Sequence, residues 1–583
     1  MKNLRLSSTI NYTNSSSSTD DFSPAALQGN QSRLYTYNGK ETKLYNRTLL
    51  RYNKTFKDGK GEDAHGFLLF AFSEINASYF KADAMLNERG VNDQLRGPLT
   101  NIIGLSNSKG GTIDYRDDRS VAFAGSFSYN YKQKYVLDFN YRLDANSQNG
   151  INAGYLANPS VSVKWNFNRE NWFNNMKWLD FADIRLSYGS NIQPVGNIFD
   201  AYGRFSGGGR YNNSPSVVLD LDRVPNLDLQ PTKATTINAG FDIAILKNKV
   251  SLSMDTYYKQ NDNIFRYKDI SSANSFARIA SNEISNVNYG WEFQGTVRPL
   301  SDSSPFKWTL NANFAINREV LAKLPDGLRD LIFIDTQNGQ DIYYRLGTNS
   351  LSNYLYNTKG VYATNSQVPV DPLTGLPYRI GSPSLLNFFK AGDPIFTDLD
   401  GNYVLNNFDK VIAGNSQPQM VGGFNSLLQW KNWTFEVQTS FTLDRDILNN
   451  PLATQLRNYN RPTVPGSLVP LNQINYWNGQ GSVSQYGNPN DYIRSGIIDP
   501  FRLSQTLFQE DGSYFKLNVI KVYYQLNQTF TRRYGIERMA VNLTGANLGF
   551  ITRYSGPNPE NVSSLGRDDS GGYPAPRQFT FGL

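Results

Sequence analysis

The chain has 583 residues, no cysteine, a single histidine and an aromatic content of 14%. The lack of cysteine excludes a disulfide framework, a thiol nucleophile and a zinc finger. The net charge of +7 comes from scattered lysine and arginine rather than a basic stripe, so no nucleic-acid partner is expected. No run approaches the ~20 apolar residues of a transmembrane helix. The mean hydropathy of −0.50 still allows a β-barrel, in which only alternate side chains meet lipid.

The N-terminal segment Met1–Ser8 lacks the apolar stretch of a secretory signal. Because an outer-membrane barrel must be exported, we expect the chain to be a fragment or the product of a gene model that begins downstream of the true start.

Alternation of apolar and polar residues with a period of two predicts antiparallel strands along the chain. From Val121 to Tyr131 apolar side chains occupy every second position, and Tyr135 to Asp144 repeats the pattern after a three-residue turn. These two segments predict a hairpin with one apolar and one polar face. The same alternation recurs at 161–167, 237–243, 250–256, 291–298, 306–316 and 433–441.

The connections predict a transmembrane barrel rather than a soluble β-sandwich, which would also alternate. Short periplasmic turns and long extracellular loops are typical of outer-membrane barrels, as are aromatic residues near the turns. We expect about 14–18 strands, a short helix at 171–179 and an even number of wall strands in the irregular region 319–420. Tight turns are expected at 132–134, 247–249, 299–305, 431–432 and 530–535, and long loops at 145–159, 190–235, 261–284, 445–512 and 548–576.

Six segments resemble motifs of the SusC/RagA family of TonB-linked outer-membrane proteins, in the family's order. Three depart from the family pattern, with Ala145 and Ile284 in place of glycine and Thr232 in place of an acidic residue. The segments are 129–147, 226–233, 282–292, 391–415, 511–517 and 572–583.

The resemblance implies an all-β fold, namely part of a 22-stranded transmembrane antiparallel barrel whose lumen is closed by a plug. Residues 1–583 would then be the C-terminal barrel part of a TonB-dependent receptor, without the signal peptide, TonB-box and plug. The family's function is active import of an oligosaccharide or peptide across the bacterial outer membrane. Its partners are a SusD-like surface lipoprotein and the TonB–ExbB–ExbD complex. The alternative is a passive porin or an adhesin-like barrel in the same membrane.

One loop has the ligand spacing of an EF-hand, which wraps a Ca²⁺ ion with six or more oxygens. Two departures weaken this interpretation, because Tyr403 replaces the usual glycine at position 6 and the last ligand is a short aspartate. A polar loop with Asx turns and no metal is therefore favoured over a calcium site, and no other cofactor is expected. The candidate ligands are Asp398, Asp400, Asn402, the Val404 carbonyl, Asn406 and Asp409.

No catalytic residues are predicted, and the protein is expected not to be an enzyme. The single histidine, His65, is interpreted as a strand-end residue, since a hydrolytic triad or zinc site would need partners that the chain lacks. The adjacent carboxylates Asp568 and Asp569 are interpreted as a solvated loop. The ligand-binding residues are not identified, although loop tyrosines suit contacts with sugars or peptides. These tyrosines are Tyr202, Tyr211, Tyr459, Tyr476 and Tyr492.

Overall fold

The computed structural model assigns seventeen strands to one large sheet, within the expected range of strand numbers. The chain divides into two compact units. Unit 1 comprises residues 1–174, 183–239 and 259–285, and unit 2 comprises 175–182, 240–258 and 286–583. The structure describes residues 3–27, 32–90, 108–335, 340–381, 387–457, 474–489, 504–568 and 575–583.

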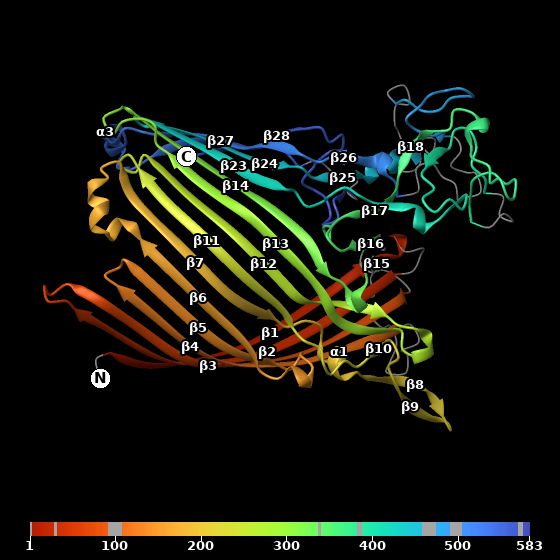
Figure 1. Ribbon diagram of the computed structural model, residues 1–583, viewed down its shortest axis with the longest axis horizontal. Helices are drawn as coiled ribbons and strands as arrows, with labels where there is room; N and C mark the ends of the chain where they lie inside the picture. The colour runs from red at the N-terminus through yellow and green to blue at the C-terminus, as the bar shows by residue number, and fades with distance from the viewer. Residues whose placement is uncertain are drawn as a thin grey trace. The chain divides into compact units, whose positions relative to one another are not determined.

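Unit 1 is built on a meander in which each strand from β1 to β7 pairs antiparallel with the next (Figure 1). The predicted hairpin of β4 and β5 is confirmed, with Tyr131 opposite Tyr135. The turn between them places Lys132 and Gln133 at φ 48° and 56°, the left-handed backbone that tight hairpin turns need. The strands are β1 (Leu4–Ser23), β2 (Ser32–Lys57), β3 (Asp63–Gly90), β4 (Ser108–Tyr131), β5 (Tyr135–Asn146), β6 (Leu156–Asn166) and β7 (Leu179–Gln193).

The first four strands are 20 to 28 residues long, about twice the ~10 residues that cross a bilayer. They therefore extend well beyond the membrane. The sequence predicted no strand before Val121, although residues 65–75 of β3 pair with the predicted segment 121–131. Beyond the membrane a strand can be polar on both faces and then shows no alternation. The run Ser15–Ser18 in β1 is an example, since it carries no alternation yet pairs in register with β2.

One predicted loop is wrong. The segment 261–284 is mostly strand, because β12 (Val250–Asp269) extends to residue 269 and β13 (Arg278–Val297) begins at 278. The polar ends of these strands resemble a loop in sequence for the same reason as β1. The long connection before β11 (Thr232–Ile245) is confirmed and carries α1 (Ile198–Tyr202), β8 (Phe205–Tyr211), β9 (Ser214–Leu219) and β10 (Arg223–Val224).

Unit 2 contains a second antiparallel meander, in which β14 pairs directly with β23. Among the described residues the number of wall strands between them is therefore zero, which agrees with the even number expected for the region 319–420. The meander consists of β14 (Phe306–Lys323), β23 (Met420–Trp430), β24 (Trp433–Leu443), β27 (Tyr514–Gln525), β28 (Ala540–Thr552) and β30 (Gln578–Gly582).

The long connections of unit 2 fold into small sheets and short helices instead of wall strands. Between β14 and β23 lie β15 (Asp330–Asp335), β16 (Gln340–Arg345), β17 (Asn353–Tyr356), β18 (Thr358–Val361), β19 (Arg379–Ile380), β20 (Pro394–Phe396), β21 (Val404–Leu405) and β22 (Lys410–Ala413). The later connections carry β25 (Asp446–Asn449), α2 (Asn450–Arg457), β26 (Gln509–Asp511), α3 (Gln528–Thr531) and β29 (Arg567–Asp568).

The wall strands of unit 2 have one apolar and one polar face. On β24 the apolar face carries Trp433, Phe435 and Val437, and register places Trp433 opposite Trp430 of β23. The polar face carries Glu436 and Gln438, which are hydrogen-bonded to each other (Gln438 Nε2 to Glu436 Oε1, 2.6 Å). The apolar face is exposed along the wall, as in a barrel that meets lipid. Exposed members include Phe424, Trp430, Trp433, Phe435, Ile520 and Leu543.

Three smaller predictions concern helices and the histidine. The expected helix at 171–179 is a shorter 3-10 helix, η5 (Asn171–Asn175). His65 lies near the start of β3, where its Nδ1 is 2.8 Å from the Tyr129 hydroxyl, so the strand-end interpretation is confirmed. Among the described residues no helix has both the length and the apolarity needed to cross a bilayer.

Candidate functional site in the loop segments

Two of the family-like segments, 391–415 and 511–517, meet at residues 445–447, where the loops of unit 2 join the wall strands. The backbone N–H of Asn415 donates to Asp446 Oδ2 (2.8 Å), and Gly512 N–H donates to the carbonyl of Arg445 (2.7 Å). A Cβ on Gly512 would lie 2.5 Å from the Ile447 side chain. The glycine at this position therefore allows a close approach of two chain segments.

Buried polar residues fix the same junction. Asn353 accepts a hydrogen bond from Arg567 Nε (3.0 Å) and donates to the Leu565 carbonyl (2.8 Å). The Tyr554 hydroxyl donates to Asp568 (2.5 Å), and burial, followed by this hydrogen bond, raises the pKa of Tyr554. Asp568 is fully buried, so its interpretation as part of a solvated loop is wrong, whereas Asp569 lies outside the described residues.

The connection between β14 and β23 has an aromatic core of its own. The rings of Tyr378 and Phe389 stack with centroids 4.9 Å apart, and Phe389 meets Phe396 edge to face. Burial raises the pKa of Tyr378 and, to about 12, that of Tyr362. This connection is therefore a folded body rather than a flexible loop. Its buried core consists of Tyr356, Tyr362, Val368, Tyr378, Phe389, Phe396 and Leu405.

The predicted acidic loop lies beside this core. Carboxylate oxygens of Asp398, Asp400 and Asp409 lie within 4.8 Å of one another. Tyr403 has φ 56°, so it adopts the left-handed backbone for which glycine is usual at this position of a calcium loop.

The same loop also has the turns expected without a metal. Asp398 accepts from the N–H groups of Gly401 (2.8 Å) and Tyr403 (3.0 Å). Asp409 is fully buried and accepts from the N–H groups of Leu399 and Asn406, both at 2.8 Å. Burial raises the pKa of Asp409. The remaining candidate ligands also form hydrogen bonds within the turns. Asn402 Oδ1 accepts from Val404 N–H, and Asn406 Oδ1 accepts from Phe408 N–H. The Val404 carbonyl accepts from Asn406 Nδ2.

The candidate loop tyrosines do not gather at one described site. Tyr202 and Tyr211 belong to the connection before β11 and are both exposed. Tyr476 forms an isolated bridge with Tyr486 in unit 2. Tyr459 and Tyr492 lie outside the described residues, as do Gly572–Pro574 of the last family-like segment.

In unit 1 the connection before β11 is held by an ionic cluster that the sequence analysis missed. Arg223 Nη1 donates to the fully buried Asp200 (2.7 Å) and to the Tyr267 hydroxyl (2.8 Å). Arg278 forms two hydrogen bonds with Asp222, at 3.0 and 2.8 Å. These contacts join positions up to 56 residues apart, so no local sequence pattern indicates them. They fix a loop surface rather than a catalytic centre.

No family model matches the chain, but individual proteins do. It is 26% identical over 572 residues to TonB-dependent receptor P3 of Formosa agariphila, covering 93% of this chain and 52% of the relative. It is 23% identical over 483 residues to TonB-dependent receptor SusC of Bacteroides thetaiotaomicron, covering 79% and 43%. A chain of the RagAB peptide transporter superposes with a TM-score of 0.76 at 16% identity, covering all of this chain and 60% of the other.

The fold is that of the β-barrel proteins of the bacterial outer membrane, and the relatives in sequence are TonB-dependent receptors. One of these relatives is SusC and the structural match is RagAB, so the similarity is to the type of receptor that the six motifs indicated. The chain spans about half the length of the relatives that it matches. These relatives are named as receptors and the structural match as a transporter, not as enzymes.

Proposed function

We propose that this chain supplies the wall and the ligand-facing loops of an importer that carries an oligosaccharide or peptide across the outer membrane. Energy would come from the TonB–ExbB–ExbD complex, and a SusD-like lipoprotein would act with the loops. The folded loop body on the strands of unit 2 carries the proposal, because a passive pore needs no such body. The names of the relatives support the same function. The assignment of residues 1–583 to the C-terminal barrel part of a longer receptor stays a prediction.

Deletion of the full-length gene is expected to abolish growth on one oligosaccharide or peptide mixture and accumulation of the labelled nutrient. Wild-type complementation should restore both, and removal of TonB should abolish uptake again, since plug displacement needs energy. The measurement is uptake of labelled oligosaccharides and peptides by whole cells. Normal growth and uptake on every nutrient tested would contradict import. Uptake that depends on the gene but not on TonB would indicate the passive porin instead.

We also propose that the acidic loop binds Ca²⁺ weakly, with a dissociation constant of about 10⁻⁴–10⁻³ M, as extracellular calcium modules do. The convergence of Asp398, Asp400 and Asp409 and the left-handed backbone of Tyr403 support the proposal. The named residues would supply side-chain oxygens and the Val404 carbonyl.

Calcium is expected to raise the thermal unfolding midpoint of the loop segments, and Asp400→Asn is expected to remove this response because the ion loses a charged ligand. Asp371→Asn is the matched control, since Asp371 forms a similar turn with Leu373 and Thr374 elsewhere in the loop body. The measurement is calorimetry with calcium or with a chelator. Identical midpoints in the two conditions would leave the loop as a metal-free set of Asx turns.

A further inference from the structure

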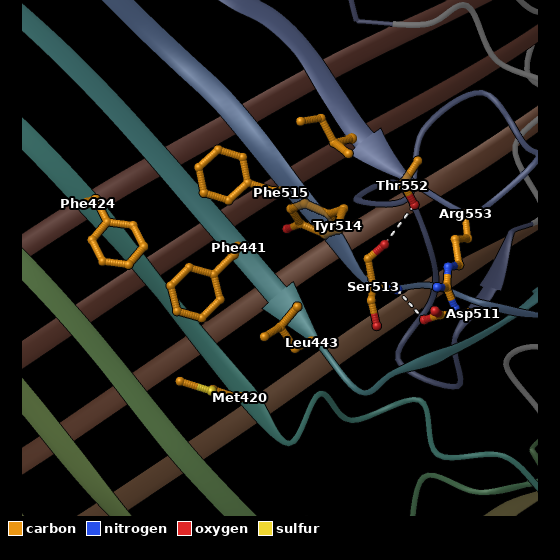
Figure 2. A pocket seen from close by; sticks show the side chains of 11 residues that line it. Met420, Phe424, Phe441, Leu443, Asp511, Ser513, Tyr514, Phe515, Thr552 and Arg553 are labelled. Atoms are coloured by element: carbon orange, nitrogen blue, oxygen red, sulfur yellow. Dashed lines mark hydrogen bonds between the residues drawn. The ribbon is translucent and has the colours of Figure 1, made fainter.

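A groove of about 600 Å³ crosses the apolar face of unit 2, at the strand ends away from the tight turn 431–432. Figure 2 shows the rings of Phe424, Phe441 and Phe515 along it, on three neighbouring strands. The full lining is Met420, Phe424, Phe441, Leu443, Asp511, Ser513, Tyr514, Phe515, Ile551, Thr552 and Arg553.

Strand register places the apolar lining on the lipid side of the wall. Phe441 pairs with Gly422 on one side and Phe515 on the other, and Phe515 pairs with Ile551. Paired residues of antiparallel strands share a face. This is the face that carries Trp433 and Phe435, so in the outer membrane the groove opens toward lipid.

The floor of the groove is Phe441, which is only 8% exposed, whereas Phe424 is 52% and Ile551 76% exposed. Gly422 explains the burial of Phe441, because a Cβ there would lie 2.6 Å from the Phe441 ring and 2.4 Å from the Asn313 carbonyl. Without a side chain at Gly422 the ring settles against the sheet and leaves a hollow above it.

The end of the groove near the loops is polar. Thr552 Oγ1 donates to the Ser513 carbonyl (2.7 Å), and Ser513 N–H donates to Asp511 Oδ1 (2.9 Å). Arg553 lies beside Asp511 (Figure 2). Arg553 is exposed, and within the described part of the chain it makes no hydrogen bond or ion pair with another side chain. The groove thus runs from an apolar floor to a polar end with an exposed cation, Arg553, whose charge also acts on Asp511.

We propose that this groove holds one lipid of the outer leaflet, with an acyl chain along the three phenylalanines and an anionic headgroup against Arg553. The outer leaflet follows from position, because strand ends opposite the short turns face the cell exterior in such barrels. A guanidinium is well suited to phosphate oxygens. The Asp511 carboxylate opposes the headgroup charge, so the acyl chain contributes most of the binding and Arg553 selects the headgroup.

The test uses protein extracted from native outer membranes and placed in phosphatidylcholine vesicles that contain diphosphoryl lipid A. Lipid retained after detergent exchange is then measured by mass spectrometry. Wild type is expected to retain about one lipid A per chain, as a single groove of this size allows. Ile551→Trp should lose most of it, because the indole fills the open side of the groove. Leu543→Trp, at an exposed position on the same strand and face outside the groove, should retain it.

Substitutions that change the charge at the polar end of the groove provide a second test. Arg553→Gln should lower retention by about tenfold, the usual effect of losing one charge-assisted hydrogen bond. Asp511→Asn keeps the oxygen that accepts from Ser513 and should raise retention. With a lipid A that lacks phosphate, both charge variants should match wild type.

Equal retention in the two tryptophan variants would overturn the proposal. It would also be overturned if neither charge variant differed from wild type on diphosphoryl lipid A, or if cross-linking placed a second copy of the chain on the groove. The proposal rests on the outer-membrane location and not on import, so its failure leaves the uptake experiment unaffected.

Discussion

Replacement of Val437 by arginine is expected to prevent stable insertion of the protein into the membrane. Val437 lies in the middle of β24 on the apolar face, opposite Ser426 and Ile520. A lipid-facing arginine at mid-bilayer depth costs about 2–4 kcal/mol, because the charge must leave water without a partner. The measurement is the fraction folded in vesicles, followed by heat-modifiable gel mobility and by the urea concentration at half unfolding.

The neighbouring substitution Gln438→Arg is the matched control for this result. Gln438 lies on the polar face, next to Glu436, where a cation meets an opposite charge and water. It should fold almost as well as wild type. Equal damage from both substitutions, or a harmless Val437→Arg, would contradict the assignment of the apolar face to lipid.

Substitution of Gly566 by alanine is expected to detach the loop segments of unit 2 from the wall. Gly566 has φ 66°, and a Cβ there would lie 2.7 Å from both the Asp446 carbonyl and the Ser416 side chain. The left-handed backbone costs about 1–2 kcal/mol for an alanine, and the overpacking adds about 1–3 kcal/mol. The expected result is faster proteolysis of the loop segments and a lower unfolding midpoint, while the wall stays folded in the membrane.

Gly347→Ala separates the clash from the backbone strain. Gly347 has φ 80° but no atom within 4 Å of the added Cβ, so only the strain of about 1–2 kcal/mol applies. The loop segments of the Gly347→Ala variant should resist protease nearly as well as those of the wild type. If the two glycine variants were cleaved at the same rate, the packing of Gly566 against Asp446 would not be what holds the loops.

Several wall strands from Val121 onward could be predicted from sequence where they lie in the membrane, because lipid on one side and water on the other impose the period of two. The hairpin of β4 and β5 and the turn at 431–432 follow from this pattern and from turn geometry. The pattern ends where a strand leaves the bilayer, since both faces then meet water. For this reason β1 and the ends of β12 and β13 resembled loops.

The candidate site was predictable only where its contacts are local. The acidic loop is a single 12-residue segment whose spacing indicates that Asp398, Asp400 and Asp409 converge, and they do. The junction joins residues far apart in sequence, such as Asn353 and Arg567, which are separated by 214 positions. No periodic pattern encodes such a contact. The burial of Asp568 against Tyr554 was missed for the same reason.

Single-cysteine labelling along β24 tests the two-faced wall most directly, because the chain has no cysteine of its own. A fluorophore would be attached at each position from 433 to 443 in turn, in protein held in vesicles. Labels at odd positions are expected to be quenched by a lipid-soluble agent, and labels at even positions by a water-soluble one. Labels shielded from both agents at either set of positions, as in two sheets packed around a dry core, would contradict the outer-membrane wall.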